Sequence, residues 1–414
     1  MASKFQAPRG TFDILPEQAR GRRRLEGAAA EVFGRAGYDP IATPVFEDTD
    51  LFERGVGQST DIVRKEMFTF EDKGGRSLTL RPEGTASVCR AYLEHGMQKL
   101  AQPVKLHYLG PFFRHERPQA GRYRQFHQLG AECIGSDSPL ADAEVIMLLA
   151  DLLAELGVPG VELRLGSLGS FEARRAYLED LKAHLHAHEG ELSRDVRERI
   201  DLNPLRAFDS DDEGTRGVMA SAPTIVERLE GEDAQHFAEV RALLDAAGIA
   251  YAIDPTLVRG LDYYTRTIFS FVCDRLGAQS EIGGGGRYDG LIEQLGGAPT
   301  PAVGFAAGIE RILLALDEEV AGEGRDAFVA IANPAQRRRA MALATELRHA
   351  GISTELDLAG RSFKSQLKHA NRIGARSVLI LEADGSAQLR DMGSGEQRPV
   401  DPGNLVEEMT GGEA

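Results

Sequence analysis

The sequence is most informative between Gly110 and Glu132, where it reads GPFFRHERPQAGRYRQFHQLGAE. This stretch concentrates arginine in a chain whose formal net charge is −16. The four arginines are Arg114, Arg117, Arg122 and Arg124. Guanidinium groups are planar and permanently charged, so they match pairs of phosphate oxygens better than lysines do. We therefore expect the segment to meet an anionic partner, either a polyphosphate or a nucleic acid.

The residues around these arginines alternate as in two β-strands. Before them, Val104, Leu106 and Tyr108 alternate with polar residues, which predicts a half-buried strand. The alternation resumes after Arg124. One face of this second strand carries an aromatic ring, an amide and a carboxylate, from Phe126, Gln128 and Glu132. A surface hairpin with a solvated, charged tip is the alternative interpretation.

Composition indicates a soluble globular protein with room for two to four domains. Hydrophobic residues make up 42% of the 414 positions. Cys89, Cys133 and Cys273 are widely separated and unpaired in spacing, which predicts a reducing cytoplasm and neither a disulfide framework nor a structural metal site. No apolar run is long enough to span a bilayer, and the first residues lack the apolar core of a signal peptide. We expect a cytoplasmic protein with no membrane partner.

The pattern of helices and strands predicts an α+β core over residues 1–325. Short strands and helices alternate irregularly there, and they would form one antiparallel sheet covered by helices. Residues from about 170 to 250 are polar and helical, including the acidic stretch Asp209 to Gly214, and are predicted to be a helical insertion. The polar segment from Asp317 to Arg325 is the best domain boundary.

Residues 326–414 are predicted to form a small α/β domain. Strands alternate with helices from Ala327 to Leu381, which implies a largely parallel sheet. Lys364, Lys368 and Arg372 follow one another at helical spacing and would make a basic stripe on one helix face. A solvated helix face explains this stripe equally well.

Four separated segments combine into a candidate site for a nucleotide and an amino acid. Phe126 offers a flat apolar surface for a base, and Arg311 could cover the other side of that base or reach a phosphate. Arg114 and Arg259 could neutralise charge that develops on phosphorus. Groups suited to an ammonium and a polar side chain come from Glu83, Thr85, Gln128, Glu132, Tyr263 and Tyr264.

Each of these groups also has an ordinary explanation. Glu83 and Thr85 could simply begin a helix, and the two tyrosines could be strand aromatics. The glycine run from Gly283 could be a loop. His184 and His188 share a helix face, which allows a metal site, although a solvated helix fits the polar segment better. The case for catalysis rests on the co-occurrence of the motifs.

The motifs together resemble those of the histidyl-tRNA synthetase family, a branch of the class II aminoacyl-tRNA synthetases, over nearly the whole chain. Three segments resemble the class II motifs: GYDPIATPVFED (37–48), FRHERPQAGRYRQFHQ (113–128) and AVGFAAGIERILLAL (302–316). Two more resemble segments specific to the histidine enzymes, LVRGLDYY (257–264) and GGGGRYDGL (283–291). The resemblance implies the class II antiparallel sheet core, and a C-terminal domain that binds the anticodon.

The resemblance also implies residue roles. The histidine pocket would contain Glu83, Gly84, Thr85, Arg114, Gln128, Glu132, Arg259, Tyr263 and Tyr264. Within it, Glu132 and Tyr264 would contact the imidazole. ATP would be held by Arg114, Glu116, Arg122, Phe126 and Arg311, and the tRNA acceptor end would face Arg117 and Gln119. Arg259, with Arg114, would be catalytic, in the place where related enzymes use a metal ion near the α-phosphate.

The implied reaction is ATP-dependent ligation of L-histidine to tRNA(His) through a histidyl-adenylate. Mg²⁺ would accompany the outer phosphates of ATP, and the segment around Pro44 would form a homodimer interface. The alternative is a non-catalytic regulatory subunit of ATP phosphoribosyltransferase, which resembles the synthetase core and senses histidine. The intact RGLDYY segment and the domain after Arg325 argue against this alternative.

Overall fold

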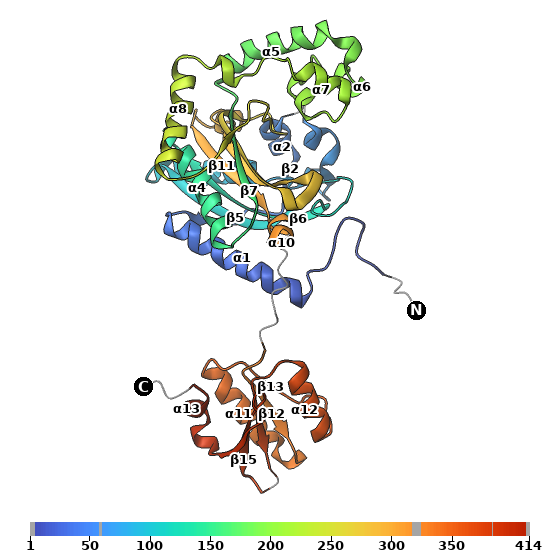
Figure 1. The fold of residues 1–414 in the computed structure, drawn as a ribbon, viewed down its shortest axis with the longest axis vertical. Helices are drawn as coiled ribbons and strands as arrows, with labels where there is room; N and C mark the ends of the chain where they lie inside the picture. The colour runs from blue at the N-terminus through green and yellow to red at the C-terminus, as the bar shows by residue number, and fades with distance from the viewer. Residues whose placement is uncertain (1–4, 58–59, 317–323, 383, 411–414) are drawn as a thin grey trace. The chain divides into compact units, whose positions relative to one another are not determined.

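The computed structural model describes residues 5–57, 60–316, 324–382 and 384–410. The chain divides into two compact units, Met1–Glu319 and Val320–Ala414 (Figure 1). Each unit has its own sheet and is described by itself. The predicted boundary from Asp317 to Arg325 falls largely on residues 317–323, which lie outside the described residues.

An eight-stranded sheet forms the centre of the first unit. Its strands, in spatial order, are β1 (Asp39–Pro40), β5 (Val104–Phe113), β6 (Gln125–Ile134), β11 (Ala302–Gly308), β10 (Glu281–Arg287), β9 (Thr265–Cys273), β7 (Val161–Ser167) and β8 (Ala252–Ile253). The α+β prediction is confirmed, and the six inner strands pair antiparallel as expected. Only the two edges depart from the antiparallel pattern, because β1 and β8 are two-residue strands that pair parallel to their neighbours.

The two faces of this sheet differ in what packs against them. One face packs against a large apolar core that includes Leu129 and Ala131 of β6. The helices on that side are α1 (Pro16–Arg35), α4 (Pro139–Glu155), α8 (Gly231–Ala246) and α10 (Ile309–Leu316). The other face carries Tyr108, Phe126 and Tyr288 in a second cluster, beside α3 (Thr85–Glu94) and α9 (Leu291–Gln294). The chemistry-bearing side chains lie on this second face.

Local sequence explains where the elements begin. Pro16 and Pro139 occupy the first turns of α1 and α4, where the missing N–H costs no hydrogen bond. The first class II segment contains β1 and then β2 (Phe46–Asp48). β2 pairs with β4 (Ser77–Leu80), which pairs in turn with β3 (Phe68–Glu71), in a small sheet beside α2 (Thr49–Val56). The segment 257–264 forms a loop, and the strand that follows it begins at Thr265.

The helical insertion has its own apolar core. That core joins α5 (Phe171–Ala187), α6 (Arg194–Arg197), the 3₁₀ helix η4 (Pro204–Asp209) and α7 (Glu213–Met219). These elements gather at the end of the first unit remote from α1 (Figure 1). The predicted insertion extends to residue 250, but Phe237, Val240 and Leu244 of α8 pack into the main core.

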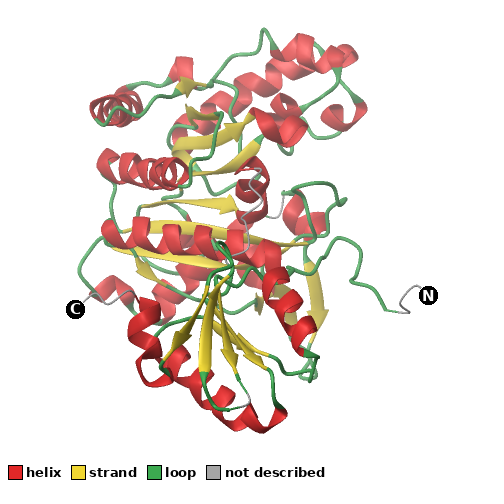
Figure 2. Cartoon of the chain, turned by 60° about the horizontal axis from the view of Figure 1, so that its bottom comes forward, coloured by secondary structure: helices red, strands yellow, loops and turns green. Residues whose placement is uncertain are grey.

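The second unit is a five-stranded sheet with helices on both faces (Figure 2). Its strands in order are β13 (Thr354–Leu356), β12 (Ala327–Ile331), β14 (Ser377–Leu381), β15 (Ala387–Asp391) and β16 (Gln397–Val400). The helices are α11 (Arg337–His349), α12 (Phe363–Arg372) and α13 (Leu405–Thr410). The sheet is less parallel than predicted, because β15 and β16 add an antiparallel half.

Candidate active site

The sheet register brings the motif residues together. Glu132 on β6 lies opposite Gly304 on β11, and β11 pairs in turn with the glycine-rich strand β10. A Cβ at Gly304 would collide with the Glu132 carboxylate, so glycine is required at this close approach. The missing side chain at Gly304 thus makes room for the Glu132 carboxylate.

Two buried carboxylates define one side of the site. Glu83 precedes α3 and accepts hydrogen bonds from the backbone N–H groups of Thr85 (2.7 Å) and Ala86 (2.9 Å). Glu132 accepts from the Thr85 hydroxyl (2.8 Å) and from the Tyr288 hydroxyl (2.5 Å). The helix-start explanation for Glu83 is therefore correct but incomplete, because Thr85 connects both carboxylates.

Burial makes both carboxylates unusually basic. It raises the pKa of Glu83 above its ordinary value, and the backbone hydrogen bonds and the nearby Arg114 only partly offset this effect. Burial raises the pKa of Glu132 to about 8, although the Tyr288 and Thr85 hydroxyls favour the ionised form. The pocket is thus prepared for a ligand that brings N–H donors or positive charge.

Aromatic residues and two unpaired polar atoms complete this pocket. The rings of Tyr263 and Tyr264 lie 4.7 Å apart, and Tyr263 packs edge-on against Tyr288 at 5.7 Å. Among the described residues, the buried Gln128 Oε1 and the Tyr108 hydroxyl lack a hydrogen-bond partner. A buried polar atom without a partner is costly, so these atoms suit a polar ligand.

The predicted arginines converge on one residue that sequence reasoning missed, Glu281 of β10. Arg259 donates from Nη1 to the Glu281 carboxylate (2.5 Å), and its guanidinium lies over the Tyr264 ring. Arg311 donates from Nη1 to the Glu281 carbonyl (2.7 Å). Arg114 is held from the other side by the Pro82 carbonyl (2.9 Å). The three arginines therefore lie around Glu281.

The electrostatics confirm that these groups are neighbours. Burial opposes ionisation of Glu281, but Arg259, Arg311 and Arg114 together hold its pKa below the ordinary value. Burial likewise opposes the charge of Arg259, and Glu281 outweighs it and raises the arginine pKa. The Glu281 side chain keeps 41% of its surface exposed, so this charged cluster opens to solvent.

The loop between β5 and β6 arranges the remaining predicted residues. The Arg114 guanidinium lies 5.5 Å from the centre of the Phe126 ring, and Glu116 forms an ion pair with Arg122. Arg117 and Gln119 are exposed at the tip, where Gln119 and Arg122 exchange two backbone hydrogen bonds of 3.0 Å. Arg311 contacts this loop through the Gly121 carbonyl (3.0 Å).

Glu281 and Tyr288 carried weak sequence signals. Both flank the glycine run, Glu281 two residues before Gly283 and Tyr288 just after Arg287. The glycine run lies between two strands, and the polar residues at its ends contact the predicted site residues, Glu281 at Arg259 and Tyr288 at Glu132. That position, rather than residue type, could have identified them.

The histidine cluster of the insertion makes local contacts. His184 Nε2 lies 3.0 Å from the Val218 carbonyl, and His188 Nδ1 lies 2.9 Å from the His184 carbonyl. His186 lies beside Asp201. Within the described residues, no group of three or more metal-binding side chains occurs. No described helix has the length and apolar character that crossing a membrane requires.

Comparison with protein-family models places two families on the chain. A family model described as histidyl-tRNA synthetase matches residues 10–312, and one described as anticodon binding domain matches residues 326–411. The chain belongs to the histidyl-tRNA synthetase family. The matched segments contain the site residues named above.

Individual relatives agree with this assignment. The chain is 48% identical to the histidine–tRNA ligase of Halothermothrix orenii over 98% of each sequence. It is also similar to the crystal structure of apo S. aureus histidyl-tRNA synthetase, at 38% identity and a TM-score of 0.82, covering 98% of this chain and 99% of that one. A Bacillus halodurans structure titled as an ATP phosphoribosyltransferase regulatory subunit/histidyl-tRNA synthetase matches at 25% identity and a TM-score of 0.68, over 92% and 99% of the chains.

Proposed function

We propose that this member of the histidyl-tRNA synthetase family ligates L-histidine to tRNA(His) at the expense of ATP. The observation that carries the proposal is the shared pocket. Two buried carboxylates with raised pKa values, Glu83 and Glu132, lie beside arginines that meet at Glu281. An amino acid with an ammonium group and an N–H-bearing ring fits the first pair, and a polyphosphate fits the arginines.

In this proposal the histidine pocket reads the substrate through hydrogen bonds. Glu132 and Tyr264 contact the imidazole, while Glu83, Thr85 and Gln128 hold the ammonium group. Gly84 lets α3 approach the sheet, because a Cβ there would collide with the Tyr108 ring. A wrong amino acid would leave these buried groups unpaired, at a cost of about 1–3 kcal/mol each.

The first step needs no protein base, because the histidine carboxylate is already ionised at neutral pH. Its oxygen attacks the α-phosphorus of ATP, and the bond from that phosphorus to the bridging oxygen breaks. Pyrophosphate leaves with the electron pair, and histidyl-adenylate remains. Arg114 and Arg259 neutralise the charge that grows on the phosphoryl oxygens. ATP enters as its magnesium complex, with the metal held mainly by phosphate oxygens.

In the second step a ribose hydroxyl of the terminal tRNA adenosine attacks the activated carbonyl. The ester forms, AMP leaves, and a phosphate oxygen of the adenylate can accept the proton. The exposed Arg117 and Gln119 at the loop tip suit contact with the acceptor end. Phe126 and Arg311 hold the adenine, with Arg122 and Glu116 beside the nucleotide.

The second unit is proposed to read the anticodon. Lys364, Lys368 and Arg372 lie along α12, where they could neutralise RNA phosphates. Deletion of Asp326 to Ala414 should spare adenylate formation but reduce the charging efficiency of tRNA by about 10²-fold, since a bipartite ligand loses one of its two anchors. Aminoacylation with limiting tRNA measures the loss, and unchanged charging would remove the assignment.

A homodimer and a cytoplasmic location are also proposed. Val45, Phe46 and Phe70 are exposed together on and beside the small sheet, in and near the segment that resembles the class II dimer motif. All three cysteines are buried free thiols, as is typical of proteins in a reducing compartment. Sedimentation of the purified protein tests the first proposal, with a monomer as the contradicting result.

Histidine-dependent exchange of labelled pyrophosphate into ATP tests the function directly. A regulatory subunit would bind histidine without catalysing exchange. This second candidate is less well supported, because the chain matches the anticodon-binding family over residues 326–411 in addition to the synthetase core. Absence of exchange in well-folded protein would favour the regulator.

A further inference from the structure

The helical insertion is attached to the catalytic core by ion pairs at the site entrance. Asp61 lies at the start of the short helix η1 (Ile62–Glu66) in the core. It accepts from Arg206 Nη2 (2.9 Å) and from Arg199 Nη1 (3.4 Å), both of which belong to the insertion. Arg174 of α5 makes a second attachment, since it donates to the backbone carbonyls of Asp262 and Tyr264. The insertion therefore holds two active-site loops.

A cleft of about 220 Å³ lies between the insertion and the core. Its charged wall is mostly basic, with five arginines against three carboxylates. The arginines are Arg64, Arg114, Arg122, Arg199 and Arg206, and the carboxylates are Asp61, Glu66 and Glu116. Arg114 and Arg122 are the residues assigned to ATP above, so the cleft continues the nucleotide site.

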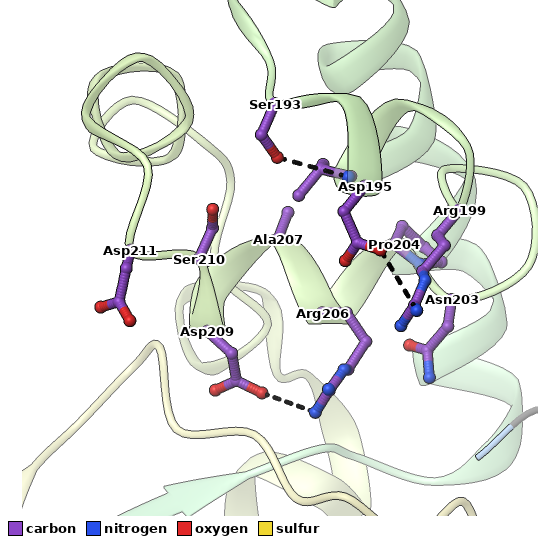
Figure 3. Close-up of a pocket in the computed structure, with 11 residues that line it drawn as sticks. Ser193, Asp195, Arg199, Asn203, Pro204, Arg206, Ala207, Asp209, Ser210 and Asp211 are labelled. Carbon is purple, nitrogen blue, oxygen red and sulfur yellow. Dashed lines mark hydrogen bonds and ion pairs between the residues drawn. The ribbon is translucent and has the colours of Figure 1, made fainter. Parts of the chain in front are cut away.

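The segment η4 contributes Arg206 to the wall of this cleft, which also contains Arg114 and Arg122. Asp209 at its end pairs with Arg206 (3.2 Å), as Figure 3 shows. Burial raises the pKa of Asp209, and the charges of Glu281 and Arg259 act on it in opposite directions. Asp209 therefore lies within electrostatic range of Glu281 and Arg259, and it holds Arg206 directly.

Arg206 and Arg199 differ in their freedom to change partner. Arg199 keeps 19% of its side-chain surface exposed and also pairs with Asp195, so it mainly supports the insertion. Arg206 is 39% exposed and holds two carboxylates, Asp61 and Asp209. Phosphate oxygens present the same acceptor geometry to a guanidinium as a carboxylate does.

We propose that Arg206 of the insertion binds the departing pyrophosphate end of ATP, and that Asp61 is its resting partner in the empty enzyme. This inference rests on the proposed function. When the bond from the α-phosphorus to the bridging oxygen breaks, the electron pair stays with pyrophosphate. A guanidinium at the outer phosphates stabilises that charge. The insertion then closes on the nucleotide through its own cation.

Pyrophosphate exchange by the full-length enzyme tests the inference with three variants. Arg206→Ala should raise the KM for ATP by about 5- to 20-fold, since a lost charged hydrogen bond costs roughly one to two factors of ten in affinity and this side chain is partly solvated. Arg206→Lys should recover part of that loss. The KM for histidine should change less than twofold in both variants. Inhibition by added pyrophosphate should weaken by the same factor as ATP binding.

Asp61→Asn separates phosphate contact from simple attachment of the insertion. It breaks the ion pairs of Asp61 with Arg206 and Arg199 but keeps both arginines, so phosphate contact predicts a lower KM for ATP. Attachment alone predicts a higher KM, as in Arg206→Ala. The matched control is Arg194→Ala, which removes an exposed ion pair with Glu198 on α6 of the same insertion.

Three results would overturn the inference. One is an ATP KM that Arg206→Ala leaves unchanged. Another is a rise in KM for tRNA alone, which would assign the arginine to the acceptor phosphates. The third is a rise in the ATP KM in Asp61→Asn equal to that in Arg206→Ala. Should Arg206→Ala fail to fold, Arg206→Lys and Asp61→Asn decide by the same criteria. Absence of exchange in the unmodified enzyme would instead refute the proposed function.

Discussion

Two clusters of buried charge lie on the same sheet, and they are built differently. In the first, Arg287 is fully buried and donates to Asp142, Asp289 and the carbonyls of Ser136 and Ser138. In the second, Glu132 is equally buried but receives only hydroxyl hydrogen bonds, from Thr85 and Tyr288. Asp142 therefore has a permanent cation, Arg287, as its neighbour, whereas Glu132 has none.

The pKa values record this difference. Burial opposes ionisation of Asp142, but His236 and Arg287 outweigh it and lower the pKa. For Glu132 burial prevails, and the pKa rises to about 8. The Arg287–Asp142 cluster is balanced in charge and needs no ligand. The cluster around Glu132 has no cation, so it can accept hydrogen bonds from donors that a substrate brings. A buried charged group is therefore not by itself evidence of a ligand-binding site. A buried carboxylate without a cationic partner is such evidence.

Removing the cation of the Arg287–Asp142 cluster gives the largest expected effect. Arg287→Met should destabilise the first unit by about 3–5 kcal/mol, because Asp142 stays buried with only His236 beside it. The unfolding midpoint in denaturant measures the change. Arg164→Met on β7 is the matched control, since Arg164 is exposed and its pair with Glu162 should contribute at most about 1 kcal/mol. If both variants shifted the unfolding midpoint by the same small amount, the proposed difference between the two clusters would be wrong.

Removing Arg259, the cation that pairs with the half-exposed Glu281, should act on rate instead. Arg259→His should leave the unfolding midpoint nearly unchanged, since Glu281 is 41% exposed and water can solvate it. It should slow adenylate formation by about 10²- to 10³-fold, the usual loss for one preorganised donor in a reaction centre. Single-turnover assays with and without preformed adenylate separate the two steps.

The exposed Arg275 supplies the control, as Arg275→His changes the same residue type outside the site. Transfer to tRNA from preformed adenylate should be affected much less than its formation. Equal losses in both steps would remove the assigned role of Arg259 at the α-phosphorus. A large loss of stability in Arg259→His would show that Arg259, like Arg287, mainly stabilises the fold.

Sequence alone located much of this architecture, because the relevant signals are local. Alternation around Tyr108 and Phe126 predicted β5, β6 and the face that carries Glu132. The strands β15 and β16 were missed, since they are short, polar and separated by a turn.

The site was only partly predictable, because two of its members depend on register between distant strands. Glu281 joins the arginines only when β10 lies between β9 and β11, and Tyr288 reaches Glu132 across the same sheet. The attachment of Arg206 to Asp61 depends on how the insertion docks, and no periodicity encodes that contact. The roles of the predicted residues remain proposals that the substitutions above test.

The last effect depends on pH and comes from Glu132 itself. In the folded, empty enzyme Glu132 holds its proton up to about pH 8, whereas an unfolded glutamate, with an ordinary pKa of 4.5, has released it. Folding therefore takes up a proton between these values, and stability falls as pH rises through that window. One such group contributes a slope of at most about 1.4 kcal/mol per pH unit.

Glu132→Gln should remove this contribution, because the amide resembles the protonated acid and does not titrate. Thermal unfolding without histidine, measured at several pH values between 5 and 8, should show the original enzyme losing stability relative to the variant. Glu179→Gln, on the exposed face of α5, serves as the control and should follow the original enzyme. Parallel curves for Glu132→Gln and the original enzyme would mean that Glu132 already has a compensating partner. The two clusters would then be alike, and the case for an N–H-donating ligand at Glu132 would fail.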